Sequence, residues 1–132
     1  MFDVMRNRPH FTEQEAARLA IEIFGVEADA HPMPSERDQN FHLRAKSGAE
    51  FVLKIASAAE EFEVLDLQNR TMARLGECGI RCPQVLAGVD GARIAETADA
   101  QGMRHFVRML SYIPGVFFAT PPRIFPATIA FT

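Results

Sequence analysis

Two runs of alternating residues on either side of a turn at residues 47–48 constrain the fold of this chain most strongly. In residues 41–45, apolar side chains alternate with polar ones. In residues 51–55, three large apolar side chains share one face of the expected strand, and Val52 and Lys54 share the other. An alternation with a period of two is typical of β-strands with one buried face. The sequence therefore predicts a β-hairpin made of these two runs.

Helical patterns flank this hairpin on both sides. Thr12 and Glu15 have the spacing of a capping box, and Gly25 follows the last apolar residue of a helical stripe. We therefore expect a helix over residues 12–25. A second apolar stripe, with spacings of three and four residues, predicts a longer helix over residues 58–78.

The remaining extended segments complete an α+β pattern. Residues 26–34 predict a strand with a ragged, proline-containing end, and residues 103–113 predict a further strand. Residues 84–88 and 92–96 predict two short strands around a turn at Asp90-Gly91. Antiparallel strands beside a packed helix form an α+β domain. A length of 132 residues predicts that there is one such domain.

The composition excludes several classes of function. The formal net charge is -3, whereas a nucleic-acid-binding surface needs clustered Lys and Arg. No stretch approaches the ~20 apolar residues of a membrane span, and residues 1–10 lack the apolar core of a signal peptide. We therefore expect a cytoplasmic protein that binds neither nucleic acid nor membrane. Cys78 and Cys82 are expected to be reduced thiols.

The last residues of the sequence, 116–132, have a different character. They contain three prolines and a single charged residue, Arg123, and are otherwise rich in Phe and Ile. Exposed termini are rarely this apolar. We expect this tail either to pack against a partner, including a second copy of the chain in a homodimer, or to mark a cut through a larger fold.

Lys54 is the first candidate for chemistry, because a lysine inside an apolar strand needs a partner for its charge. A bound phosphate would serve as that partner, and so would a carboxylate from the following helix. A lysine on a solvated face of the sheet is the alternative that the spacing leaves open. Gln68 is a second candidate, since a polar group on an apolar helical stripe needs a hydrogen-bond partner. An edge position in contact with water is its alternative.

The polar segment of residues 35–40 is a third candidate. Its backbone N–H groups and the side chains of Ser35, Gln39 and Asn40 could donate hydrogen bonds to phosphate oxygens. The segment has no glycine to let the backbone approach an anion closely, and its acidic residues would repel a phosphate unless Arg37 or a metal offset them. An ordinary polar turn is the alternative.

Taken in order, five segments of the chain resemble a known family. These segments are Pro34 to Leu43, Phe51 to Ile55, Leu67 to Asn69, Gly79 to Pro83 and Val107 to Gly115. Their order and spacing are similar to the N-terminal small lobe of the aminoglycoside phosphotransferase and choline kinase superfamily, the phosphotransferase enzyme family. Within that family they resemble hydroxylysine-kinase-type proteins and the phosphotransferase domains fused to class III aminotransferases.

The resemblance implies a protein-kinase-like small lobe over residues 1–115, with a twisted antiparallel sheet of about five strands, one packed helix and an N-terminal helix. It implies that the 35–40 segment covers nucleotide phosphates, that Lys54 contacts the α- and β-phosphates, and that residues 111–113 form a hinge beside adenine. The helix residue that orients the lysine is usually a glutamate, and Gln68 aligns there, with Glu61 as the alternative partner. The implied nucleotide-binding residues are Ser35, Arg37, Gln39, Asn40, Val52, Lys54, Gln68, Ser111, Tyr112 and Ile113.

The resemblance also implies an activity, the ATP-dependent transfer of a phosphoryl group with Mg2+ in the parent enzyme. The acceptor would be a hydroxyl of an amino alcohol, a hydroxylated amino acid or an aminoglycoside-like substrate. After Gly115 the sequence has no Asp, Asn, Glu or His, so the catalytic base and metal ligands of a C-terminal catalytic lobe are expected to be absent. We expect this fragment to bind ATP weakly, without transferring phosphate, and residues 116–132 to form an apolar tail at the interlobe hinge. A non-catalytic oligomerisation or interaction domain is the alternative function.

Overall fold

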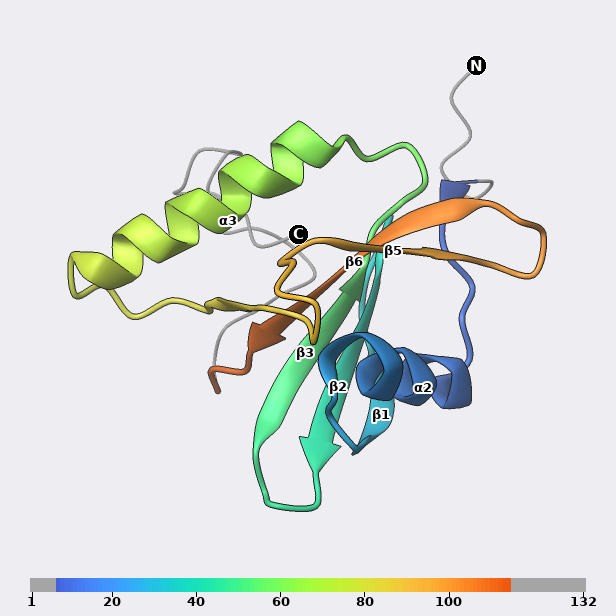
Figure 1. Cartoon of the computed structure of the whole chain (residues 1–132), viewed down its shortest axis with the longest axis horizontal. Helices are drawn as coiled ribbons and strands as arrows, with labels where there is room; N and C mark the ends of the chain where they lie inside the picture. Colours follow the sequence, from blue (N-terminus) through green and yellow to red (C-terminus); the bar gives the residue numbers. More distant parts are fainter. Residues whose placement is uncertain (1–6, 115–132) are drawn as a thin grey trace.

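A computed structural model describes residues 7–114 as an antiparallel sheet with a helix on each face (Figure 1). In chain order the described elements are α2 (Glu13–Phe24), β1 (Ala28–Met33), β2 (Gln39–Ala45), β3 (Glu50–Ile55), α3 (Phe62–Glu77), β4 (Val85–Leu86), β5 (Ala95–Ala98) and β6 (Arg104–Ser111). The strand order is β1-β2-β3-β6-β4, and β5 also pairs with β6. The predicted α+β class and the hairpin of β2 and β3 are confirmed, with six described strands where about five were expected.

Helix α2 forms where its capping signals predict. The Thr12 side chain accepts a hydrogen bond from the Glu15 N–H, and the Glu15 carboxylate accepts one from the Thr12 N–H. At the other end Gly25 takes a φ of 68°, a left-handed conformation that costs glycine nothing because it has no Cβ. Between the caps, the buried residues Ala16, Leu19, Ala20 and Phe24 face the sheet.

The sheet separates two hydrophobic clusters because successive strand residues point to opposite faces. The larger cluster joins α2 to the face that carries Phe41, Leu43, Leu53, Ile55, Val107 and Met109. The smaller cluster lies on the α3 face, where Val52 and Leu110 contact Met72. The face of β3 that holds Val52 and Lys54 is therefore the one covered by α3, and it carries fewer apolar side chains.

The two predicted short strands, β4 and β5, are present, and the structure shows how they pair. The turn at Asp90-Gly91 is present, but the short strands on its two sides do not pair with each other. Both pair with β6 instead, β4 at Met109 and Leu110 and β5 along residues 104–107. Strand β6 is eight residues long and so offers one edge to two short strands in succession. The turn is attached to α2, because the Val89 N–H donates a hydrogen bond to the Ile23 carbonyl near the end of that helix.

Three further predictions concern the apolar tail, membrane-spanning segments and the two cysteines. The apolar tail of residues 116–132, with its expected partner or homodimer contact, lies outside the described residues. Within residues 7–114, none of the helices combines the length and the apolar character that a membrane crossing requires. Cys78 and Cys82 are both free thiols, as expected.

Candidate functional site

Lys54 lies at the centre of a polar cluster under α3. Lys54 is only 2% exposed. It therefore does not lie on a solvated face of the sheet, which was the alternative to a buried position. The strand register places Lys54 directly opposite Asn40 on β2 and opposite Arg108 on β6. The Lys54 ammonium donates a hydrogen bond to Asn40 Oδ1 at 3.0 Å. A row of three polar side chains thus crosses the sheet on the face covered by α3.

Arg108 is the residue of this cluster that sequence reasoning missed. It is also 2% exposed, and its guanidinium donates to Asn69 Oδ1 at 2.9 Å and to Gln68 Oε1 at 3.1 Å, both on α3. The expected contact between Gln68 and Lys54 is therefore replaced by one between Gln68 and Arg108. The alternative partner, Glu61, is exposed at the start of α3.

The electrostatics of the cluster favour an anion. Burial lowers the pKa of Lys54 to about 7, with the charge of Asp38 acting to raise it and that of Arg108 acting to lower it further. Burial also lowers the pKa of Arg108 to about 10, against the charges of Asp38 and Glu60. Asp38 is itself buried, at 9% exposure. Two buried cations thus share one buried carboxylate, and a bound anion would offset the excess positive charge.

The loop between β1 and β2 is held next to this cluster from two sides. The Asp38 carboxylate accepts a hydrogen bond from the Ser57 N–H at 2.9 Å, and Arg37 lies 4.0 Å from Glu60. On the outer side, the Arg8 guanidinium donates to the Glu36 carbonyl at 3.1 Å and reaches Ser35 Oγ at 3.5 Å. The acidic Asp38, expected to repel phosphate, therefore stabilises the loop and the two cations.

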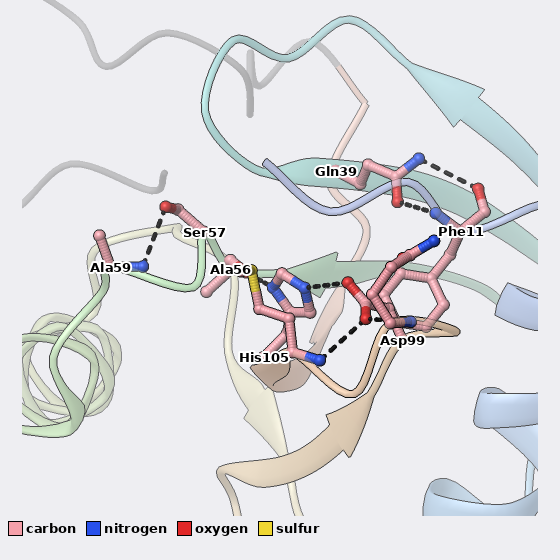
Figure 2. A network of polar contacts seen from close by, with 9 residues as sticks. Phe11, Gln39, Ala56, Ser57, Ala59, Asp99 and His105 are labelled. Carbon is pink, nitrogen blue, oxygen red and sulfur yellow. Dashed lines mark hydrogen bonds and ion pairs between the residues drawn. The ribbon is translucent and has the colours of Figure 1, made fainter. Parts of the chain in front are cut away.

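Gln39 is not brought together with Lys54, because neighbouring strand residues face opposite ways. Its amide forms two hydrogen bonds with the backbone of Phe11, accepting from the N–H at 2.6 Å and donating to the carbonyl at 3.1 Å (Figure 2). Gln39 thus fastens the segment before α2 to the sheet. Asn40, one residue later, points to the opposite face and accepts the hydrogen bond from Lys54.

Figure 2 also shows how the segment after β3 is fixed. The buried His105 ring contacts the Ala56 carbonyl through Nδ1 at 2.9 Å and the Asp99 carboxylate through Nε2 at 3.2 Å. Ala56 precedes Ser57, whose N–H binds Asp38. The contacts of His105 thus position the backbone that holds the loop carboxylate.

An apolar patch lies beside the cluster, two residues along β3. Val52 is fully buried against Leu110, and Tyr112 packs on this pair with its ring 4.5 Å from that of His42. Ser111 is tied to Gln84, since the Ser111 N–H donates to the Gln84 carbonyl and the Gln84 N–H donates to Ser111 Oγ. The predicted hinge residues are therefore placed next to the predicted roof residue, with Ile113 following in the chain.

The magnesium expected from the resemblance has no ligand set among residues 7–114. No group of three or more His, Cys, Asp or Glu side chains that could hold a metal ion occurs in that part of the chain. The one buried carboxylate of the cluster, Asp38, is already bound to a backbone N–H.

Comparisons with known proteins show the family of this chain. The family model described as "Phosphotransferase enzyme family" matches residues 29–130. Hydroxylysine kinase of Danio rerio is 29% identical over 119 residues, which cover 86% of this chain and 34% of the relative. Hydroxylysine kinase of Mus musculus is 30% identical over 121 residues, which cover 82% of this chain and 32% of the relative. The chain spans about a third of the length of these curated relatives.

Solved structures show the same fold. A microcompartment-associated aminopropanol kinase has a TM-score of 0.66 and 14% identity, over 76% of this chain and 32% of that chain. An amicoumacin kinase in complex with AMP-PNP, Ca2+ and Ami has a TM-score of 0.66 and 15% identity, over 80% of this chain and 32% of that chain. These likenesses confirm the kinase-like small-lobe fold expected from the sequence. Because the family model covers most of the chain and the fold agrees with it, this chain belongs to the phosphotransferase enzyme family.

Proposed function

We propose that this chain is the nucleotide-binding lobe of an ATP-dependent small-molecule kinase. The observation that carries the proposal is the pair of buried cations, Lys54 and Arg108, beside an apolar patch around Val52. Polyphosphate and a purine base have the charge and the apolar character that these two regions would bind. Membership of a phosphotransferase family supports ATP as the ligand.

Each region has a role in this proposal. Lys54 contacts the α- and β-phosphates, and the loop residues Ser35 and Arg37 lie over them, with Asn40 orienting the lysine ammonium. Tyr112, the half-buried member of the apolar patch, packs on adenine, and the buried Val52 supports that patch. The backbone from Ser111 to Ile113 offers hydrogen bonds to the base. Gln39 and Gln68 act indirectly, because their amides are bound to Phe11 and Arg108.

The acceptor belongs to a second step of the proposal. The names of the relatives, hydroxylysine kinase and aminopropanol kinase, support a hydroxyl on an amino alcohol or a hydroxylated amino acid. Residues 7–114 provide no metal ligand set, and phosphoryl transfer depends on metal and positioned charge. We therefore propose that these 132 residues bind nucleotide without transferring phosphate. The free thiols of Cys78 and Cys82 are compatible with a cytoplasmic location.

Calorimetric titration of the full chain with MgATP tests the nucleotide site. The chain has two lysines, so Lys46→Met is a matched control for Lys54→Met. Lys46 is exposed, follows the last residue of β2 and pairs with Glu27. We expect Lys54→Met to weaken MgATP binding by about tenfold to a hundredfold, the value of a charge-assisted hydrogen bond of ~1.5–3 kcal/mol. Equal affinities for the two variants and the unmodified chain would contradict the site.

A further inference from the structure

Helix α3 is fastened to the described sheet at two places by side-chain hydrogen bonds. Near its middle, the Gln84 amide and the Cys82 thiol donate to the Met72 carbonyl at 2.8 and 3.4 Å. One turn earlier, Arg108 donates to both Gln68 and Asn69. The Gln84 contact comes from the segment that leads into β4, whereas Arg108 comes from β6, the strand next to Lys54.

Arg108 therefore acts on two neighbours at once. Its guanidinium forms a planar fork that suits two adjacent acceptors, and Gln68 and Asn69 provide them from consecutive positions of α3. Its charge lies on the residue directly opposite Lys54, where cross-strand side chains approach within about 5 Å. Moving or removing Arg108 should alter both the position of α3 and the field at the lysine.

We infer that Arg108 is the positioning residue of this site: it fixes α3 over the sheet through Gln68 and Asn69, and its charge acts on the anion-binding Lys54 from the neighbouring strand. The inference rests on the proposed function only in naming nucleotide phosphate as the anion. Arg108 adds its charge to the anion site, and the role inferred here is to position α3 through its hydrogen bonds to Gln68 and Asn69.

The groups around Lys54 define how it should titrate. Asp38 approaches Lys54 from the loop before β2, and Arg108 approaches it from β6. Glu60, in the segment before α3 with Arg37 beside it, acts on Arg108. Strand β2 contributes the neutral Asn40, with His42 two residues further along, and α3 contributes the neutral Gln68 and Asn69. Arg108 is the one neighbouring cation among the described residues whose charge acts to lower the pKa of Lys54.

The first experiment follows the ammonium of Lys54 without any nucleotide. A chain labelled with 13C-lysine gives signals from Lys46 and Lys54 alone, and the Cε shift of each is read as a function of pH. We expect Arg108→Gln to move the Lys54 midpoint upward by about one unit, because a neighbouring like charge is gone. Gln84→Met, which loosens α3 without a change of charge, should leave that midpoint in place. The midpoint of Lys46 should not move in either variant.

The second experiment measures hydrogen exchange of the α3 backbone amides. Arg108→Lys keeps the charge but replaces the fork with one ammonium on a different stem, so exchange in α3 should accelerate about tenfold or more. Arg104→Gln is the matched control, because Arg104 lies on the same face of β6 but is exposed and pairs with Glu96. That variant should leave α3 exchange unchanged.

Together the two readouts decide the inference. If Arg108→Gln left the Lys54 midpoint unmoved, or Arg108→Lys left α3 as protected as in the unmodified chain, the positioning role would be wrong. If Arg108→Gln failed to fold, hydrogen exchange of the α3 amides in Arg108→Lys and in Asn69→Leu would still test the inference. Neither measurement uses nucleotide. If the chain bound no ATP, the proposed function would be refuted, but the two measurements would still test the positioning role of Arg108.

Discussion

Lys54 and Arg108 lie directly opposite each other on β3 and β6, each with 2% of its surface exposed. Two cations in this register repel, and burial adds the cost of removing both from water. Asp38 and the neighbouring amides offset part of that cost. The arrangement is therefore poorly suited to stabilising the fold and well suited to binding an anion. Substitution of Lys54 should accordingly weaken anion binding without lowering the stability of the fold.

The first prediction concerns the stability of Lys54→Met. Methionine has a similar length and no charge, so it removes the cost of desolvation and fits beside Val52. We expect the free energy of unfolding at pH 6 to stay the same or to rise by about 1 kcal/mol or more, measured by urea denaturation. A clear loss of stability would show that Lys54 stabilises the fold, and would contradict this prediction.

The second prediction concerns pH. The pKa of Lys54 is lowered from 10.5 to about 7 in the folded chain, so between these values the unfolded chain binds the extra proton. The free energy of unfolding should therefore rise with pH above 7, with a contribution of up to about 1.4 kcal/mol per pH unit. MgATP affinity should fall over the same range, because the neutral amine attracts phosphate less.

Urea denaturation from pH 7 to 9 measures the first trend, and calorimetric titration measures the second. Lys54→Met should remove this part of the pH dependence of stability. If the unmodified chain and Lys54→Met gave parallel stability curves across this range, the lysine would not be titrating there.

The third prediction separates two neighbours on β2. Gln39→Ala should cost about 1–3 kcal/mol of stability, because the Phe11 N–H and carbonyl lose their partners. MgATP affinity should stay within about twofold, since Gln39 faces away from Lys54. Asn40→Ala should weaken MgATP binding about fivefold or more, the equivalent of one hydrogen bond of ~1 kcal/mol. The reverse pattern in titration would place the nucleotide on the other face of the sheet.

The fourth prediction concerns the buried His105. His105→Ala should reduce the free energy of unfolding by about 2–4 kcal/mol, because it leaves a cavity beside Phe11 and removes a partner from the Ala56 carbonyl.

Asp99→Asn tests the carboxylate that contacts the same ring. Burial acts to raise the pKa of Asp99, but the Met103 N–H and His105 lower it below the ordinary value of 3.8.

A lowered pKa of this kind gives stability that is present above pH 3.8 and is lost as the pH falls through the folded value. The stability difference between the unmodified chain and Asp99→Asn should therefore shrink on acidification, measured by urea denaturation at pH 3 to 6. A difference that grows towards low pH would contradict the contact.

Local signals in the sequence predicted the parts of the fold that depend on near neighbours. The capping box at Thr12 and the glycine at Gly25 define α2, and the alternation around Lys54 assigns it to the same face as Val52. These features depend on contacts within a few residues, so a single sequence contains the information.

The missed features depend on which distant strands become neighbours. Arg108 enters the site only because β6 pairs with β3 in a register that opposes it to Lys54. Gln68 was paired with the wrong cation because two cations lie side by side, and only the register shows that Arg108 is under that turn of α3. The short strands β4 and β5 were predicted from a local turn, whereas the free edge of β6 decided their pairing.

The most direct test of the central claim is a titration of the 13C-lysine-labelled chain with MgATP at pH 7, with the Cε signals of Lys46 and Lys54 followed by NMR. We expect the Lys54 signal to move towards its protonated position and to saturate, while the Lys46 signal stays in place. An unmoved Lys54 signal at saturating MgATP, or equal changes at both lysines, would contradict a nucleotide site built on the buried cations.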